Sequence, residues 1–164
     1  MNRIHHVEQL RFTARLFSSL QRQCIGGGGF PLLCPTREYD WIETWSCRLV
    51  HSNSGFAEAN CVFETDLPNA EKEIWIVSRY EPPRAIEFVK MAAGHYVVKY
   101  DVLLFPNDDG TASSVWTQTL IGLREAGNQY IDEFDSAAYH ERMDMIGKML
   151  NYYLSTGKKL ELTA

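Results

Sequence analysis

The stretch YVVKYDVLLFPNDDGTASSVWTQTLIGL, residues 96–123, contains two segments rich in β-branched and aromatic residues. In the first segment, apolar side chains at alternate positions face away from a mixed face that carries Lys99 and Asp101. This alternation is typical of a half-buried β-strand. The Pro-Asn-Asp-Asp-Gly sequence at 106–110, between the segments, is typical of a hairpin turn. We therefore predict a pair of neighbouring antiparallel strands here.

Segments of the same kind precede this hairpin along the chain. Parallel strands need crossover connections of about a dozen residues or more, so the short connections between these segments favour antiparallel pairing. A further strand is predicted over residues 10–16, where Leu10, Phe12 and Leu16 alternate with polar residues. Together with the hairpin, these segments predict a seven-stranded antiparallel sheet. The remaining predicted strands are residues 47–51, 57–65, 73–80 and 85–91.

The C-terminal part of the chain has a different period. Apolar residues recur there at spacings of three and four, which is typical of one apolar stripe on an amphipathic helix. Asp135 or Ser136 is the expected N-cap of this helix, and Gly157 is its expected end. The helix must bury its stripe, and the concave face of the curved sheet is the available partner. The stripe contains Tyr139, Met143, Ile146, Leu150 and Tyr153.

The predicted order of elements is a strand, short helices, six strands and a long helix. Residues 17–45 are expected to supply the turns and short helices, one of them beginning at Pro35. The fold class is therefore α+β, with an antiparallel sheet wrapped around the C-terminal helix. The length of 164 residues fits a single domain over residues 1–164, with residues 10–157 as its core.

Composition excludes several classes of protein. The net charge of −5 is unfavourable for binding nucleic acid or an anionic membrane surface. No apolar run approaches the ~20 residues of a membrane span, and no apolar signal segment follows Met1, so a cytoplasmic location is expected. The four cysteines form no metal-binding spacing, and we expect neither a metal nor a cofactor. The unusual feature is the ring content, with 4 Trp, 8 Tyr and 8 Phe.

Several local strings occur in the order found in a known superfamily. They are FPLLCPTREYDWI at 30–42, CVF at 61–63, YEPP at 80–83, WTQT at 116–119 and MLNYYL at 149–154. On these strings the chain resembles the START-like superfamily, also called SRPBCC or helix-grip proteins, and within it uncharacterised bacterial members near polyketide cyclases and dehydratases. The resemblance implies a deep cavity between sheet and helix. Across the superfamily such cavities hold lipids, sterols, polyketides or plant hormones.

The rings of the strands and of the helix stripe are the candidate walls of that cavity. Some of them must be plain core, since burial of one such side chain is worth ~1.5–3 kcal/mol without any ligand. A few polar groups would orient a ligand, and we select Arg79, Glu38 and His51. The alternative role for Glu38 is a structural ion pair with neighbouring charges. The alternative for His51 is that its side chain is exposed to solvent and contacts no ligand. The predicted ligand-binding residues are Trp41, Phe63, Trp75, Phe88, Tyr100, Trp116, Tyr139, Met143 and Ile146.

Three functions are compatible with this sequence. The preferred one is binding of a hydrophobic small molecule, such as a lipid, a polyketide or an aromatic metabolite, without catalysis. The second is a polyketide cyclase or dehydratase-like enzyme, for which no acid–base pair can be recognised, so the catalytic residues are unknown. The third is a partner-binding module or a homodimer that uses the outer face of the sheet near Val97, Leu103 and Phe105.

Overall fold

The computed structural model describes residues 16–25, 28–66, 72–92 and 95–162. Seven strands form one antiparallel sheet in the order β1-β7-β6-β5-β4-β3-β2. Neighbours in the chain are neighbours in the sheet except for β1, which pairs with β7. The strands are β1 (Leu16–Ile25), β2 (Cys47–His51), β3 (Val62–Thr65), β4 (Glu73–Glu81), β5 (Ala85–Ala92), β6 (Tyr96–Pro106) and β7 (Ala112–Gly122).

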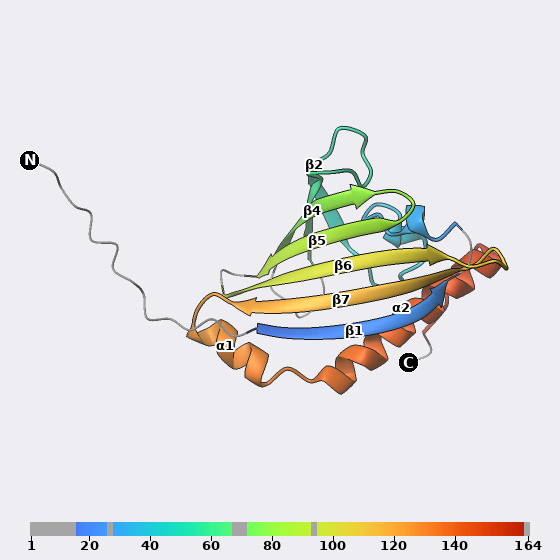
Figure 1. Cartoon of the computed structure of the whole chain (residues 1–164). Helices are drawn as coiled ribbons and strands as arrows, with labels where there is room; N and C mark the ends of the chain where they lie inside the picture. Colours follow the sequence, from blue (N-terminus) through green and yellow to red (C-terminus); the bar gives the residue numbers. More distant parts are fainter. Residues whose placement is uncertain (1–15, 26–27, 67–71, 93–94, 163–164) are drawn as a thin grey trace, which may run out of the picture.

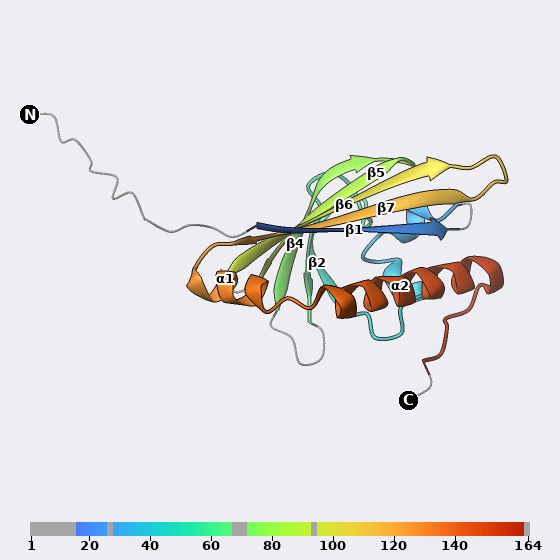
Figure 2. The same cartoon turned by 60° about the horizontal axis from the view of Figure 1, so that its bottom comes forward.

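The helices lie on one side of the curved sheet. Helix α2 (Ser136–Thr156) runs along that side, and the shorter α1 (Glu125–Asp132) lies at one end of it, next to β7 (Figures 1 and 2). Two single turns of 3-10 helix, η1 (Phe30–Leu32) and η2 (Glu38–Asp40), lie in the connection between β1 and β2. Among the described residues, no helix is long and apolar enough to cross a membrane.

Helix α2 begins and ends where its sequence predicts. The side chain of Asp135 accepts hydrogen bonds from the backbone N–H groups of Ala137 and Ala138, at 2.9 and 3.0 Å. Gly157 has a left-handed backbone with φ of 67°, and its N–H donates to the carbonyl of Tyr153 at 2.7 Å. These contacts satisfy backbone groups that have no partner inside the helix. The predicted α+β helix-grip architecture is therefore confirmed.

Some boundaries differ from the predictions. Most of the strand predicted over 10–16 lies outside the described residues, and β1 instead covers 16–25, where we had expected turns and short helices. Apolar and polar residues do not alternate regularly in β1, so its sequence gives no strand signal. The strand forms because it pairs with β7 along its whole length, from Leu16 opposite Ile121 to Ile25 opposite Ala112. The strand predicted over 57–65 begins only at Val62, because Asn60 has a positive φ of 67° that breaks the extended chain.

The core fills only part of the space between the sheet and α2. Leu150 is fully buried and Met149 nearly so, in the C-terminal half of the helix. They pack into one cluster with buried side chains of the sheet and of the segment that contains η1 and η2, among them Trp41 at 1% exposure. The N-terminal half of α2 instead carries Tyr139, Met143 and Ile146 over a cavity. The same apolar stripe of α2 thus packs into the core at its C-terminal end and forms one wall of a cavity at its N-terminal end.

Candidate functional site

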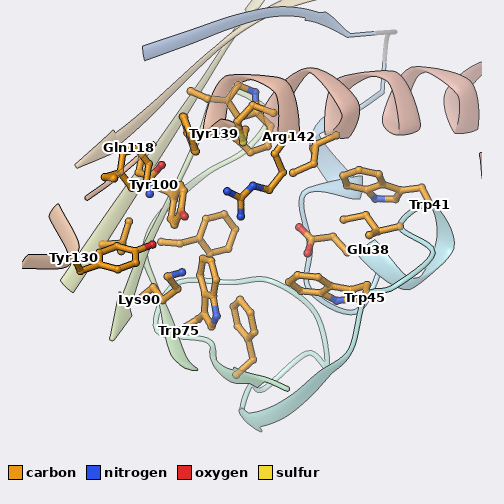
Figure 3. A pocket seen from close by; sticks show the side chains of 18 residues that line it. Glu38, Trp41, Trp45, Trp75, Lys90, Tyr100, Gln118, Tyr130, Tyr139 and Arg142 are labelled. Atoms are coloured by element: carbon orange, nitrogen blue, oxygen red, sulfur yellow. The ribbon is translucent and has the colours of Figure 1, made fainter. Parts of the chain in front are cut away.

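A cavity of about 200 Å³ lies between the sheet, η2, α1 and α2 (Figure 3). Side chains of β3, β4, β5, β6 and β7 form its sheet wall. Residues in and after η2 form a second wall, and α2 covers it with Tyr139, Arg142, Met143 and Ile146. All four tryptophans of the chain line this cavity, namely Trp41, Trp45, Trp75 and Trp116.

Stacked rings form the centre of the sheet wall. Trp75 stacks on Phe63 with centroids 5.6 Å apart and on Tyr100 at 5.5 Å. Phe88 meets Phe63 and Trp75 edge-on, at 6.2 Å in both cases. The strand register explains the cluster, because Phe63 lies opposite Trp75 and Phe88 lies opposite Tyr100. Such cross-strand aromatic contacts hold the rings in one geometry, so the wall is preorganised.

Lys90 is a charged residue within this aromatic wall. Its Nζ lies 2.7 Å from Oε1 of Glu73, and both side chains are only 13% exposed. The ammonium also lies 5.0 Å from the ring centroid of Trp75 and 5.8 Å from that of Tyr100. A partly buried cation is tolerated where a carboxylate and ring faces replace its water. The charge of Lys90 is therefore already compensated by the protein.

Glu38 faces the cavity from the opposite wall without a partner. Within the described part of the chain, its carboxyl makes no side-chain hydrogen bond and no ion pair, and burial raises its pKa to about 8. The indole N–H groups of Trp41 and Trp45 are not available to it, because they donate to the carbonyls of Leu32 and Pro35. A carboxyl with this pKa is mostly protonated at neutral pH, so it can donate a hydrogen bond into the cavity.

The expected alternative for Glu38, a structural ion pair with neighbouring charges, does not form among the described residues. Arg37 instead pairs with Asp40 three residues further on, with Nε 2.6 Å from Oδ2. That contact lies on the outside of η2 and leaves Glu38 on the inside. The short 3-10 turn separates neighbouring side chains, which explains why adjacent residues face different environments.

The remaining polar groups lie near α2. Arg142 is exposed to solvent, and its side chain points into the cavity in Figure 3. Burial raises the pKa of Tyr100 and of Tyr139, so both hydroxyls stay protonated. In the described part of the molecule, the hydroxyl of Tyr139 and Oε1 of Gln118 are buried without a hydrogen-bond partner. Burying a polar atom without a hydrogen-bond partner costs free energy. These two atoms are therefore candidates for hydrogen bonds with a ligand.

The structure brings together most of the residues selected from sequence. Glu38 and all the predicted ligand-binding residues lie on the cavity wall, whereas Arg79 and His51 do not. That the wall residues bind a ligand stays a prediction. The residues placed on the wall are Trp41, Phe63, Trp75, Phe88, Tyr100, Trp116, Tyr139, Met143 and Ile146.

Arg79 and His51 lie elsewhere for local reasons. The pairing of β4 with β5 shifts between Val77 and Arg79, so an extra residue is inserted and the following side chains exchange faces. Arg79 therefore lies outside, where its Nη2 is 2.6 Å from Oε2 of Glu81, and Tyr80 packs against the core instead. His51 is exposed at the end of β2. Neither side chain can orient a ligand in this cavity.

Sequence reasoning overlooked Lys90 and Arg142, although signals for both exist. Lys90 follows Phe88 by two residues in a strand, so the two side chains share a face. Arg142 is three residues after Tyr139 and four before Ile146, which places it on the same side of the helix as the stripe. Their charge alone predicts solvent exposure, whereas their spacing places both on the cavity side; Lys90 is largely buried there and Arg142 remains exposed. No cluster of three potential metal ligands occurs among the described residues.

Comparison with known proteins finds similarity in structure only. No protein-family model and no curated protein matches the sequence. Norcoclaurine synthase from Thalictrum flavum aligns over 87% of this chain and 88% of its own, with 4% identity and a TM-score of 0.64. Ginseng major latex-like protein 151 from Panax ginseng aligns over 84% of this chain and 97% of its own, with 12% identity and a TM-score of 0.63.

A further structure of the Thalictrum flavum enzyme is a complex with dopamine and hydroxybenzaldehyde. It aligns over 87% of this chain and 89% of its own, with 6% identity and a TM-score of 0.61. At such low identity these similarities show the fold alone. The resemblance to the bacterial subgroup near polyketide cyclases stays a prediction. The chain has the helix-grip fold that is shared by these plant proteins and that the START-like resemblance implies.

Proposed function

We propose that this protein binds a hydrophobic small molecule in the cavity between its sheet and α2. The observation that carries the proposal is a ring-lined space of about 200 Å³ that the core side chains leave unfilled. A ligand that packs on these rings removes apolar surface from water, which is favourable. The rigid aromatic wall offers the ligand a preformed surface.

The size of the cavity favours a compact ring compound over a long-chain lipid. A cavity of ~150 Å³ is enough to bind benzene, whereas drug-sized ligands occupy pockets of ~300–1,000 Å³. About 200 Å³ therefore suits one ring with a short substituent. The complex of norcoclaurine synthase with dopamine and hydroxybenzaldehyde is a case in which a protein of this fold holds such compounds. Among the ligand classes considered, an aromatic metabolite fits best.

Filling the cavity from α2 should abolish binding. Ile146 lies on the cavity wall, so in Ile146→Trp the larger ring should occupy the space of a ligand and weaken binding by at least about tenfold. The matched control is Met145→Trp on the same helix, since Met145 is 36% exposed and does not line the cavity. Phenylacetamide is a suitable neutral probe, because the four cavity tryptophans should report its binding by fluorescence.

Native mass spectrometry of the freshly purified chain provides an independent test. We expect a population with an added small mass in the wild type and in Met145→Trp, and its loss in Ile146→Trp. If the wild type carries no added mass and its fluorescence does not respond to phenylacetamide, the binding function is wrong.

A second candidate function, catalysis, is favoured by Glu38 itself. An unpaired carboxyl with a pKa of about 8 can act as an acid near neutral pH. In the loss of water from a β-hydroxy ketone, Glu38 would donate its proton to the leaving hydroxyl. The carboxylate so formed would take the α-proton as the carbon–carbon double bond forms, so the protein ends unchanged.

Dehydration of a β-hydroxy ketone with one phenyl ring can be followed by the absorbance of the conjugated product. Glu38→Gln should slow any protein-dependent dehydration by about a hundredfold or more, since an amide cannot exchange the proton. An equal rate in the variant would exclude this role for Glu38.

The partner-binding alternative also stays a prediction. On the outer face Phe105 is 50% exposed, and a homodimer formed there would be detected by sedimentation.

A further inference from the structure

The charges around the cavity are unbalanced, and this imbalance indicates the kind of ligand. Resting on the proposed binding function, we propose that the cavity takes a small ring-bearing carboxylate, with its anion between the guanidinium of Arg142 and the carboxyl of Glu38. Arg142 supplies the positive charge in this arrangement. Glu38, in its acid form, supplies a hydrogen-bond donor.

The three residues that could carry a charge at the cavity are Glu38, Lys90 and Arg142. Lys90 is neutralised by Glu73, at 2.7 Å, and is held against Trp75 and Tyr100. Arg142 is a solvent-exposed residue of α2 that lines the cavity, and no carboxylate lies within 4.0 Å of it among the residues that the structure describes. One cation of the wall is therefore left without a counter-charge. A carboxylate is the ligand group that matches a guanidinium in both charge and shape.

Glu38 does not provide the missing negative charge. Its carboxyl is in an apolar corner with Trp41 and Trp45, and burial raises its pKa to about 8. The titratable groups that face it are Arg142 across the cavity and Lys90 and Tyr100 on the sheet wall. Burial is the main cause of the raised pKa of the Cys47 thiol on β2, and the nearby Glu38 raises that pKa to a smaller extent. None of these groups pairs with Glu38, so the protonated form prevails at neutral pH.

The geometry allows both groups to reach one ligand. Glu38 and Arg142 point into the same space from η2 and from α2, and the rings of the sheet wall border that space (Figure 3). A ligand ring can therefore pack against the aromatic sheet wall while its carboxylate reaches Arg142. The alternative ligand is a protonated amine, which would need Glu38 as a carboxylate and would be repelled by Arg142. The two classes differ in the sign of their pH dependence.

The decisive experiment compares three probes of the same size by tryptophan fluorescence of the full chain: phenylacetate, phenylacetamide and phenethylamine. At about pH 6.5 we expect phenylacetate to bind at least about tenfold more tightly than phenylacetamide. Arg142→Gln should remove this preference, so that phenylacetate and phenylacetamide bind about equally to the variant. Lys148→Gln is the matched control, because it removes one positive charge from an exposed position of the same helix. It should keep the preference.

The pH profile tests the role of Glu38. Phenylacetate affinity should be constant between about pH 6 and 7, where the probe is ionised, and should fall toward tenfold per pH unit above about pH 8, as Glu38 ionises and repels the anion. Glu38→Gln keeps a hydrogen-bond donor and cannot ionise, so its profile should be flat. Phenethylamine affinity should instead rise over the same interval, yet remain below that of phenylacetate at about pH 6.5.

The outcomes of these measurements distinguish a failure of the carboxylate proposal from a failure of the binding function. Equal binding of phenylacetate and phenylacetamide, or tighter binding of phenethylamine, would overturn the carboxylate proposal and leave the binding function standing. A preference that survives Arg142→Gln would also overturn it. Failure of all three probes, together with no added mass in the native mass spectrum, would overturn the binding function itself.

Discussion

Replacing Trp41 by alanine should destabilise the protein by about 3–5 kcal/mol. The side chain is 1% exposed and packs between the core and the cavity. Its Nε1 donates to the backbone carbonyl of Leu32 at 3.0 Å, so the substitution also leaves a buried carbonyl without its partner. Urea denaturation followed by far-UV circular dichroism measures the change in the free energy of unfolding.

Two variants separate the contributions to this loss. Trp41→Phe keeps most of the ring volume and removes the hydrogen bond, so it should cost less than half as much as alanine. Tyr152→Ala changes a ring of α2 that is 38% exposed, and should cost much less than Trp41→Ala. A Trp41→Ala protein as stable as wild type would show that the segment around η2 is not anchored to the core, contrary to its observed burial.

Gly127→Ala should cost about 1–3 kcal/mol although alanine is the better helix former. Gly127 of α1 is buried against the turn before β6, and an added Cβ would overlap the carbonyl oxygen of His95 and lie 2.8 Å from its carbonyl carbon. That carbonyl already accepts a hydrogen bond from the N–H of Leu123 at 2.8 Å, so it has little freedom to move. Helix α1 must therefore shift away from the sheet.

The shift should also affect the cavity, since α1 carries Tyr130 on its wall. Tyr130 stacks on Tyr96 with centroids 4.3 Å apart, a contact that depends on the close approach at Gly127. Thermal unfolding gives the stability change, and phenylacetamide titration gives the change at the site. Ala126→Gly, at the exposed preceding position, is the control and should cost about 1 kcal/mol by helix propensity alone. A more stable Gly127→Ala protein would contradict the close contact.

Periodicity was a good guide wherever burial is one-sided. The spacing from Tyr139 to Tyr153 predicted the buried stripe of α2, and Asp135 and Gly157 predicted its ends. It failed where one extra residue changes the face of a strand. The shift between Val77 and Arg79 has no counterpart in the hydrophobic pattern, because residues on both faces of β4 are apolar. The position of Arg79 outside the cavity could therefore not be predicted.

The sequence alone determined the α+β class, the antiparallel hairpins, the long helix and the set of rings available for a cavity wall. These features follow from local preferences and from the need to bury one face of each element. The folded arrangement was needed to show that the core and the cavity share the stripe of α2, that Glu38 lacks a partner among the described residues while Lys90 has one, and that the side chain of Arg142 points into the cavity (Figure 3). Those properties depend on distances between residues far apart in the chain, because desolvation and charge pairing are set by the groups that folding brings together.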